Sequence, residues 1–193
     1  VKDNENSNGD YYIYVGRISE EKGMKTLIDA AAKVNTCKLK IAGTGPLENE
    51  MKFYVESKNA SDKIEFLGYQ EHSDVMRLLS NCRFVVLPSE CYENFPFAVI
   101  EAFSCGKPAI GTRVGGIPEI IKNWETGLLF ESGDSEELSL KINFFVTHPD
   151  KAEKMGKVAR MFVEKELNVE KHYQELIEIY ERAILKKTVK VKK

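Results

Sequence analysis

Two glutamates, Glu93 and Glu101, are separated by seven residues and follow an apolar run that predicts a buried strand. If this strand ends near Pro88 and a helix begins near residues 95–96, the first carboxylate lies on the connecting loop and the second about two turns along the helix. Both carboxylates could then contact one ligand. Taken singly, Glu93 fits a solvated loop residue and Glu101 a helix residue paired with a neighbour. The segment around Glu101 is apolar, however, so its carboxylate requires N–H or hydroxyl partners.

Two cationic residues follow an earlier predicted strand. Arg17 and Lys22 lie on a short polar loop that Gly16 and Gly23 bracket. Two cations and free backbone N–H groups could bind an anion there. Charge-assisted hydrogen bonds contribute ~1.5 to 3 kcal/mol each, so this pair could dominate the affinity for a diphosphate. The alternative is ordinary surface charge.

Glycine turns after two further predicted strands give weaker signals. Gly43 and Thr44 follow the second strand, where glycine permits a close approach to a ligand but also serves in a plain strand-to-helix turn. Gly115 and Gly116, after the fifth strand, could provide backbone amides or merely turn the chain. We expect His72 to be non-catalytic, because no second ligand lies near it in the sequence.

Short β-rich runs alternate with segments of helical period. Strands are predicted at residues 11–16, 38–43, 63–68, 83–89, 108–112 and 128–130, and helices at 22–34, 47–57, 73–81, 95–104, 117–122 and 135–146. This alternation predicts an α/β fold: a Rossmann-like, doubly wound parallel sheet of six strands, with helices on both faces and a helical C-terminal tail. The strand order 3-2-1-4-5-6 would open a ligand crevice between strands 1 and 4, where both candidate motifs lie.

Composition narrows the class of protein. The chain has 193 residues and is 42% hydrophobic, which is enough for one hydrophobic core. Its net charge of -2 produces no positive electrostatic field that would attract nucleic acid. Four cysteines without a Cys-x-x-Cys pair and three dispersed histidines disfavour zinc sites and disulfide frameworks. Without a long apolar stretch or a signal peptide, the sequence favours a cytoplasmic protein.

The two ends differ from the rest of the chain. Residues 1–10 begin at Val1 and are typical of a linker or a cut interdomain boundary, so we expect a fragment of a longer polypeptide. Residues 11–185 are predicted to form the domain with its C-terminal helices. Residues 186–193 include five lysines and are expected to fray into solvent, either as a solubilising tail or in a weak peripheral contact with an anionic membrane.

The ordered set of motifs resembles the C-terminal, donor-binding domain of a retaining family 4 (group 1) glycosyltransferase of GT-B architecture, over nearly the whole chain. The matching segments are Gly16-Arg17 with Lys22-Gly23, Gly43-Thr44-Gly45-Pro46, Phe66-Leu67-Gly68-Tyr69, Glu93 through Glu101, Gly106-Lys107-Pro108, Gly115-Gly116-Ile117-Pro118-Glu119 and Thr126-Gly127-Leu128-Leu129.

This resemblance implies a role for each candidate side chain. Arg17 and Lys22 would hold the diphosphate of a UDP-, GDP- or ADP-sugar. Glu93 would bind the hexose hydroxyls and Glu101 the ribose hydroxyls, with the base near Tyr69. The catalytic residues would be Arg17, Lys22 and Glu93, since stabilising the charge on the departing diphosphate is the catalytic task of this half.

The resemblance also places turn and helix-start residues around the donor: Gly16, Gly43, Thr44, Asn94, Phe95, Pro96 and Phe97. Many relatives have glycine where this chain has Pro96. Because proline lacks an N–H group, it cannot donate a hydrogen bond from that position.

A resemblance to one half of an enzyme implies a missing half. The acceptor domain would precede Val1, and the helix near residues 170–185 would cross back to it. The whole enzyme would transfer a hexose to a glycan or lipid-linked acceptor, as in polysaccharide biosynthesis, with retention and without a metal or other cofactor. We expect the chain alone to bind donor but to transfer little sugar.

Three alternatives compete with this interpretation. A nicotinamide-dependent oxidoreductase would need Gly-x-Gly-x-x-Gly after strand 1 and an acidic residue after strand 2, where this chain has Gly16-Arg17 and Gly43. A non-catalytic nucleotide-sugar binding module would retain the same pocket. A GT-B sugar-nucleotide epimerase shares the half-fold, although the glutamate pair and the Arg/Lys set favour a transferase.

Overall fold

The computed structural model describes residues 9–191, with side chains through residue 184. Most of the expected linker, residues 1–8, lies outside the described residues. Six strands form one parallel sheet in the order β3-β2-β1-β4-β5-β6, as predicted. They are β1 (Tyr11–Val15), β2 (Lys38–Ala42), β3 (Ile64–Gly68), β4 (Val85–Leu87), β5 (Ala109–Thr112) and β6 (Gly127–Phe130).

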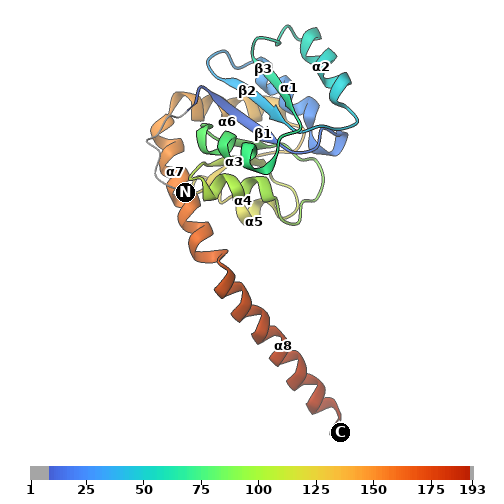
Figure 1. Ribbon diagram of the computed structural model, residues 1–193, viewed down its shortest axis with the longest axis vertical. Helices are drawn as coiled ribbons and strands as arrows, with labels where there is room; N and C mark the ends of the chain where they lie inside the picture. The colour runs from blue at the N-terminus through green and yellow to red at the C-terminus, as the bar shows by residue number, and fades with distance from the viewer. Residues whose placement is uncertain (1–8, 192–193) are drawn as a thin grey trace.

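Helices connect the strands and continue beyond the sheet (Figure 1). They are the 3-10 turn η1 (Glu20–Lys22), α1 (Met24–Ala32), α2 (Glu48–Ser57), α3 (His72–Asn81), α4 (Phe97–Ser104), α5 (Ile117–Ile120), α6 (Ser135–Thr147), α7 (Pro149–Glu166) and α8 (Val169–Val191).

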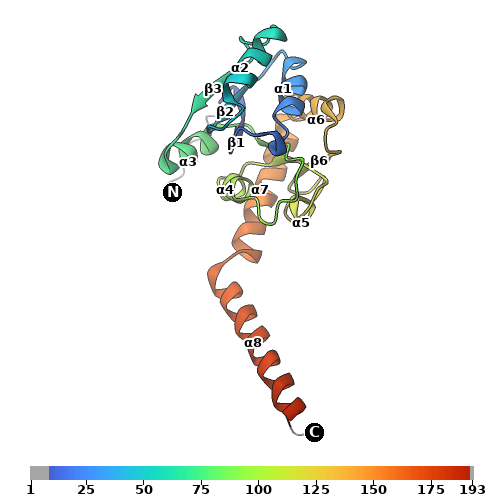
Figure 2. The same cartoon turned by 90° about the vertical axis from the view of Figure 1, so that its right-hand side faces the viewer.

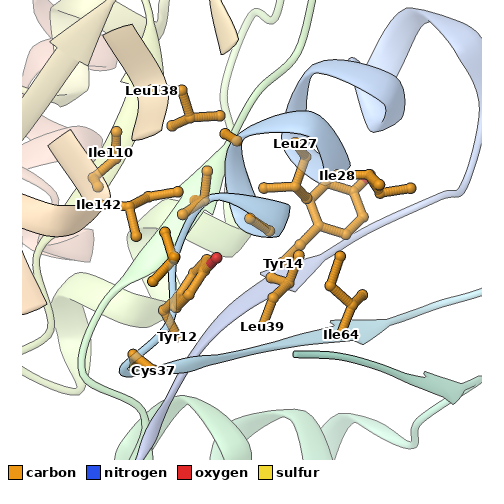
Figure 3. Packing of buried hydrophobic residues seen from close by; sticks show 14 of the residues in the cluster. Tyr12, Tyr14, Leu27, Ile28, Cys37, Leu39, Ile64, Ile110, Leu138 and Ile142 are labelled. Carbon is orange, nitrogen blue, oxygen red and sulfur yellow. The ribbon is translucent and has the colours of Figure 1, made fainter. Parts of the chain in front are cut away.

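Alternate residues of β1 face opposite cores. Tyr12 and Tyr14 point to the face that α1, α2 and α6 cover, and Figure 3 shows this packing. Ile13 points to the other face, against α3 and α4. That second layer continues with α5 and α7 beside β5 and β6. Because both faces of the sheet are buried, its strands appear in the sequence as nearly continuous apolar runs.

Two helices next to the candidate site begin later than predicted. Gly23 has a left-handed φ of 65° and separates η1 from α1, so the helix begins at Met24 rather than at Lys22. Helix α4 begins at Phe97, with Pro96 as its N-cap at an extended ψ of 90°. Proline disfavours the helical conformation in the residue before it, which excludes residue 95 from the helix.

Strand β4 is shorter than the predicted strand of residues 83–89. It ends at Leu87, which pairs with Gly111 of β5. Pro88 follows and has no N–H group to extend the ladder. Residues 88–96 are therefore available as a loop at the carboxyl end of the sheet.

Helix α8 projects away from the rest of the domain (Figure 2). It reaches Val191 and therefore includes residues 186–191, which we expected to fray. This segment contains neither glycine nor proline, so nothing in it interrupts the helix. Tyr173, Tyr180 and Ile184 are more than half exposed. Among the described residues, no helix is long and apolar enough to cross a membrane.

Candidate functional site

Two loops meet at the carboxyl ends of β1 and β4, the neighbouring strands from which the sheet extends in opposite directions. The backbone N–H of Glu90 donates to the carbonyl of Glu21 at 2.8 Å, and the Thr26 hydroxyl donates to Oε1 of Glu90 at 2.7 Å. A Cβ on Gly23 would lie 2.0 Å from the carbonyl oxygen of Pro88. Only glycine permits this approach, so the contact fixes residues 16–23 against residues 88–93.

Lys22 and Glu93 meet where these loops join. The Lys22 ammonium contacts Oε1 of Glu93, and the Ser89 hydroxyl donates to the same oxygen at 2.8 Å. Ser89 is fully buried, and its carbonyl accepts a hydrogen bond from Thr112 Oγ1 at 2.7 Å. The Lys22 and Glu93 side chains are 24% and 18% exposed. The contact therefore lies in a partly buried place, where water screens it less than at the surface.

Arg17, the other predicted cation, is exposed, and its guanidinium makes no ion pair with any described residue. Its backbone carbonyl accepts a hydrogen bond of 2.6 Å from the Tyr14 hydroxyl. Burial, followed by the negative charge of Glu93, raises the pKa of Tyr14 well above its usual value, so the hydroxyl remains a donor. The structure thus provides one paired cation and one unpaired cation at the end of β1.

A pocket of about 190 Å³ opens beside this pair. Gly16, Lys22 and Glu93 are among the residues that line it, together with the segment from Phe95 to Phe97. The rings of Phe95 and Phe97 pack edge to face with 5.5 Å between their centroids, and both are exposed. The lining of the pocket therefore includes both charged and aromatic side chains.

A second pocket, of about 270 Å³, is lined by Gly23 and by residues of α1 and α2. It contains Lys25, whose ammonium is already 3.0 Å from Glu50. Its acidic residues also include Glu20 and Glu90. Because acidic side chains predominate there, this pocket suits an anion less well than the smaller one does.

The glycine turns support the site from behind. The N–H of Gly116 donates to the backbone carbonyl of Glu93 at 2.7 Å, and a Cβ on Gly115 would lie 2.8 Å from the Glu93 nitrogen. A Cβ on Gly43 would lie 1.9 Å from the carbonyl oxygen of Gly16. These glycines allow neighbouring loops to pack closely, a role that the sequence alone did not separate from ligand binding.

Thr44 and Asn94 take part through their backbones. The Thr44 carbonyl accepts from the N–H of Ile18 at 3.0 Å and so joins the turn after β2 to the loop after β1. A Cβ on Gly116 would lie 2.6 Å from the carbonyl oxygen of Asn94. Neither residue lines the pocket, and neither do Arg17 and Gly43. Thr44 lies on a loop bonded to the loop after β1, and Asn94 lies between the lining residues Glu93 and Phe95.

Glu101 and Tyr69 do not line this pocket. Glu101 Oε1 lies 3.6 Å from Nδ1 of His72, the first residue of α3, which is close but beyond hydrogen-bond range. Tyr69 is 70% exposed. Sequence reasoning set His72 aside, and no sequence signal joins it to Glu101, because α3 and α4 become neighbours only in the fold.

Within the part of the chain that the structure describes, no cluster of three His, Cys, Asp or Glu side chains could hold a metal ion. The charged groups described at the site are the side chains of Arg17, Lys22 and Glu93.

A family model described as "Glycosyl transferases group 1" matches residues 1–162. The chain belongs to the group 1 glycosyltransferases. The chain is 33% identical over 171 residues to the N-acetyl-alpha-D-glucosaminyl L-malate synthase of Bacillus anthracis, covering 87% of the chain and 44% of that protein. It is 32% identical to an uncharacterized glycosyltransferase of Methanocaldococcus jannaschii, covering 87% and 49%. The chain thus spans about half the length of the curated relatives it matches.

Solved structures show the same fold for this group 1 glycosyltransferase. Sucrose-phosphate synthase from Thermosynechococcus elongatus matches with a TM-score of 0.81 and 28% identity, over 91% of this chain and 46% of that one. The C-terminal domain of a group 1 glycosyl transferase from Francisella tularensis matches with a TM-score of 0.75 and 23% identity, over 83% and 88%. The chain therefore has the fold of a C-terminal GT-B domain.

Proposed function

We propose that this chain is the donor-binding half of a retaining, family 4 glycosyltransferase that transfers a hexose from a UDP-, GDP- or ADP-sugar. The observation that carries the proposal is the meeting of Lys22 and Glu93 beside one pocket at the β1/β4 switch point. Open α/β sheets bind ligands at that position. A cation for phosphate and an acceptor for sugar hydroxyls are the two groups that a nucleotide sugar requires.

Structural neighbours support this class of ligand. HepE from Anabaena has been solved with UDP and with UDP-glucose, and it matches this chain with TM-scores of 0.83 and 0.82 at 24% identity. The match covers 91% of this chain and 49% of that one. Family membership and this fold both favour a nucleotide-diphosphate sugar as the donor.

Each side chain in the proposed site has a separate task. Arg17 and Lys22 bind the diphosphate, and Glu93 accepts hydrogen bonds from the hexose hydroxyls. Glu101 binds the ribose, with the base near Tyr69. The exposed guanidinium of Arg17 is free of ion pairs with the described residues and can turn toward the diphosphate.

The reaction follows from these positions. The bond between the anomeric carbon and the phosphate oxygen breaks, and its electron pair stays with the departing diphosphate. Lys22 and Arg17 stabilise this growing negative charge more than they stabilise the ground state, which lowers the barrier. Fixed cations can supply this stabilisation without a metal ion, so we propose metal-independent transfer.

The acceptor belongs to the rest of the proposed enzyme. Since the curated relatives are about twice as long as this chain, we propose that a further domain binds a glycan or lipid-linked acceptor opposite the pocket. Transfer then takes place between the two domains.

Calorimetric titration with UDP, GDP and ADP tests the proposed site. Lys22→Ala is expected to weaken binding of the preferred nucleotide by about tenfold to a hundredfold, because a charge-assisted hydrogen bond contributes ~1.5 to 3 kcal/mol. Lys25→Ala is the matched control, since Lys25 pairs with Glu50 outside the pocket and is 61% exposed. Equal losses in the two variants, or no loss in Lys22→Ala, would contradict the site.

A further inference from the structure

We propose that Glu93 makes the site selective for a sugar-linked nucleotide over the bare nucleoside diphosphate, because it holds Lys22 while the site is empty. This inference rests on the proposed function and adds a second task to Glu93. The carboxylate binds the sugar, and it also competes with the diphosphate for the same ammonium group.

The contact between Lys22 and Glu93 is imposed by the backbone. Gly23 packs directly on the Pro88 carbonyl, and the Glu90 N–H bonds to the Glu21 carbonyl. These contacts fix the residues on either side of Lys22 against the loop that bears the carboxylate. The two side chains therefore face each other at short range before any ligand arrives.

The buried Ser89 hydroxyl fixes the carboxylate on its other side. Ser89 and Lys22 both bond to Oε1 of Glu93. No described residue donates to Oε2, so one oxygen holds the empty-site partners and the other remains available for a ligand. This division lets the carboxylate respond to a sugar without leaving Ser89.

A bare diphosphate meets two obstacles in this arrangement. It must draw the Lys22 ammonium away from a carboxylate that already neutralises it. Its phosphate oxygens then lie near the negative charge of Glu93, and like charges at this range repel each other in a partly buried site. Both effects weaken the binding of the product-like ligand.

A sugar-linked diphosphate removes both obstacles. The hexose hydroxyls donate hydrogen bonds to Glu93 in place of the ammonium, and the sugar ring separates the carboxylate from the phosphates. Lys22 is then available for the diphosphate. After transfer, the hydroxyl donors leave with the sugar, Glu93 recovers Lys22, and the bare diphosphate is released more readily.

Glu93→Gln tests this competition, because glutamine keeps the shape and the bond from Ser89 but removes the charge that holds Lys22. In calorimetric titrations of the 193-residue chain, we expect the variant to bind the preferred member of UDP, GDP and ADP about tenfold more tightly than the wild type, the gain expected from freeing one charge-assisted bond. The ratio of affinities for the glucose-linked and bare nucleotides should fall toward one.

Glu90→Gln provides a matched control with the same change of charge on the same loop. Glu90 bonds to Thr26 rather than to Lys22, so its variant should bind the bare nucleotide within about twofold of the wild type. In a Lys22→Ala background, Glu93→Gln should give a smaller gain than it gives with Lys22 present. Thermal unfolding checks that each variant folds, and Glu93→Ala replaces Glu93→Gln if the glutamine disturbs the loop.

Two failures are distinguishable. If the wild type binds a bare nucleotide and Glu93→Gln binds it equally or more weakly, Glu93 positions Lys22 for the ligand instead of competing with it, and this inference is overturned. If neither protein binds any of the three nucleotides or their glucose-linked forms, the proposed function fails and takes this inference with it.

Discussion

Tyr12 and Tyr14 lie two positions apart on β1, and both side chains are buried in the same core (Figure 3). Only one of them has a polar task. The Tyr14 hydroxyl donates to the Arg17 carbonyl and so anchors the loop that carries both proposed cations. The Tyr12 hydroxyl is buried without a hydrogen-bond partner among the described residues. At the scale of single residues, Tyr12 therefore serves as a control for the free energy that the Tyr14 hydrogen bond contributes.

Substitution of each tyrosine by phenylalanine measures this difference. Tyr14→Phe should lower the free energy of unfolding by about 1 kcal/mol, the usual contribution of such a bond, and weaken binding of the preferred nucleoside diphosphate several-fold. Tyr12→Phe should be neutral or slightly stabilising, because it removes an unsatisfied buried hydroxyl. Urea unfolding and calorimetry check both effects. Equal losses of stability in the two variants would argue against the anchoring role of Tyr14.

At the scale of elements, the site depends on how closely the loops that follow the strands can pack. Left-handed Gly23 ends η1 and precedes α1, and its missing side chain admits the Pro88 carbonyl. Gly115 and Gly116 do the same behind Glu93. Contacts between backbones, rather than between flexible side chains, therefore hold the loops that bear the charged side chains.

Gly23→Ala tests this packing against Gly133→Ala. Both glycines have positive φ, 65° and 77°, so alanine strains the backbone at either position, by roughly 1 kcal/mol. A Cβ at Gly133 meets nothing within 4 Å, whereas at Gly23 it would lie 2.0 Å from the Pro88 oxygen. We expect Gly23→Ala to lose clearly more stability in urea unfolding and to lose nucleotide binding. Similar losses of stability and binding in the two variants would mean that backbone strain at positive φ, and not the contact with Pro88, accounts for the effect of Gly23→Ala.

At the scale of the whole molecule, the proposed function makes the chain one side of a reaction site. The pocket holds groups suited to the donor, and the chain spans about half the length of its curated relatives. Helix α8 extends beyond the domain, and Tyr173, Tyr180 and Ile184 on it are exposed. That this helix crosses back to another domain remains a prediction.

The chain alone should therefore bind a nucleotide sugar without catalysing its transfer. We expect calorimetry to detect donor binding, while a coupled assay of nucleoside diphosphate release shows no multiple turnover with an added acceptor. A longer polypeptide that includes the proposed acceptor domain is the comparison, since it supplies the opposite wall of the cleft. Sustained turnover by the 193-residue chain would show that this half is sufficient and the prediction wrong.

The sequence by itself determined the layout of the sheet and placed the candidate residues at the ends of particular strands. Strands buried on both faces leave apolar runs, and right-handed crossovers allow few strand orders, so local patterns were enough to predict six parallel strands. The same patterns placed Arg17, Lys22 and Glu93 at the ends of β1 and β4. The predicted starts of α1 and α4 were less accurate. Gly23 has a left-handed backbone and Pro96 an extended one, and the period of apolar residues does not report these backbone angles.

Only the tertiary structure decided which of these side chains touch. Lys22 and Glu93 are 71 positions apart, and their contact depends on the approach of Gly23 to Pro88. The approach of His72 to Glu101 likewise depends on the packing of α3 beside α4. Distances between segments remote in sequence are set by the packing of whole elements. Residue type and spacing could therefore identify the charged candidates, but they could not show that Glu93 contacts Lys22.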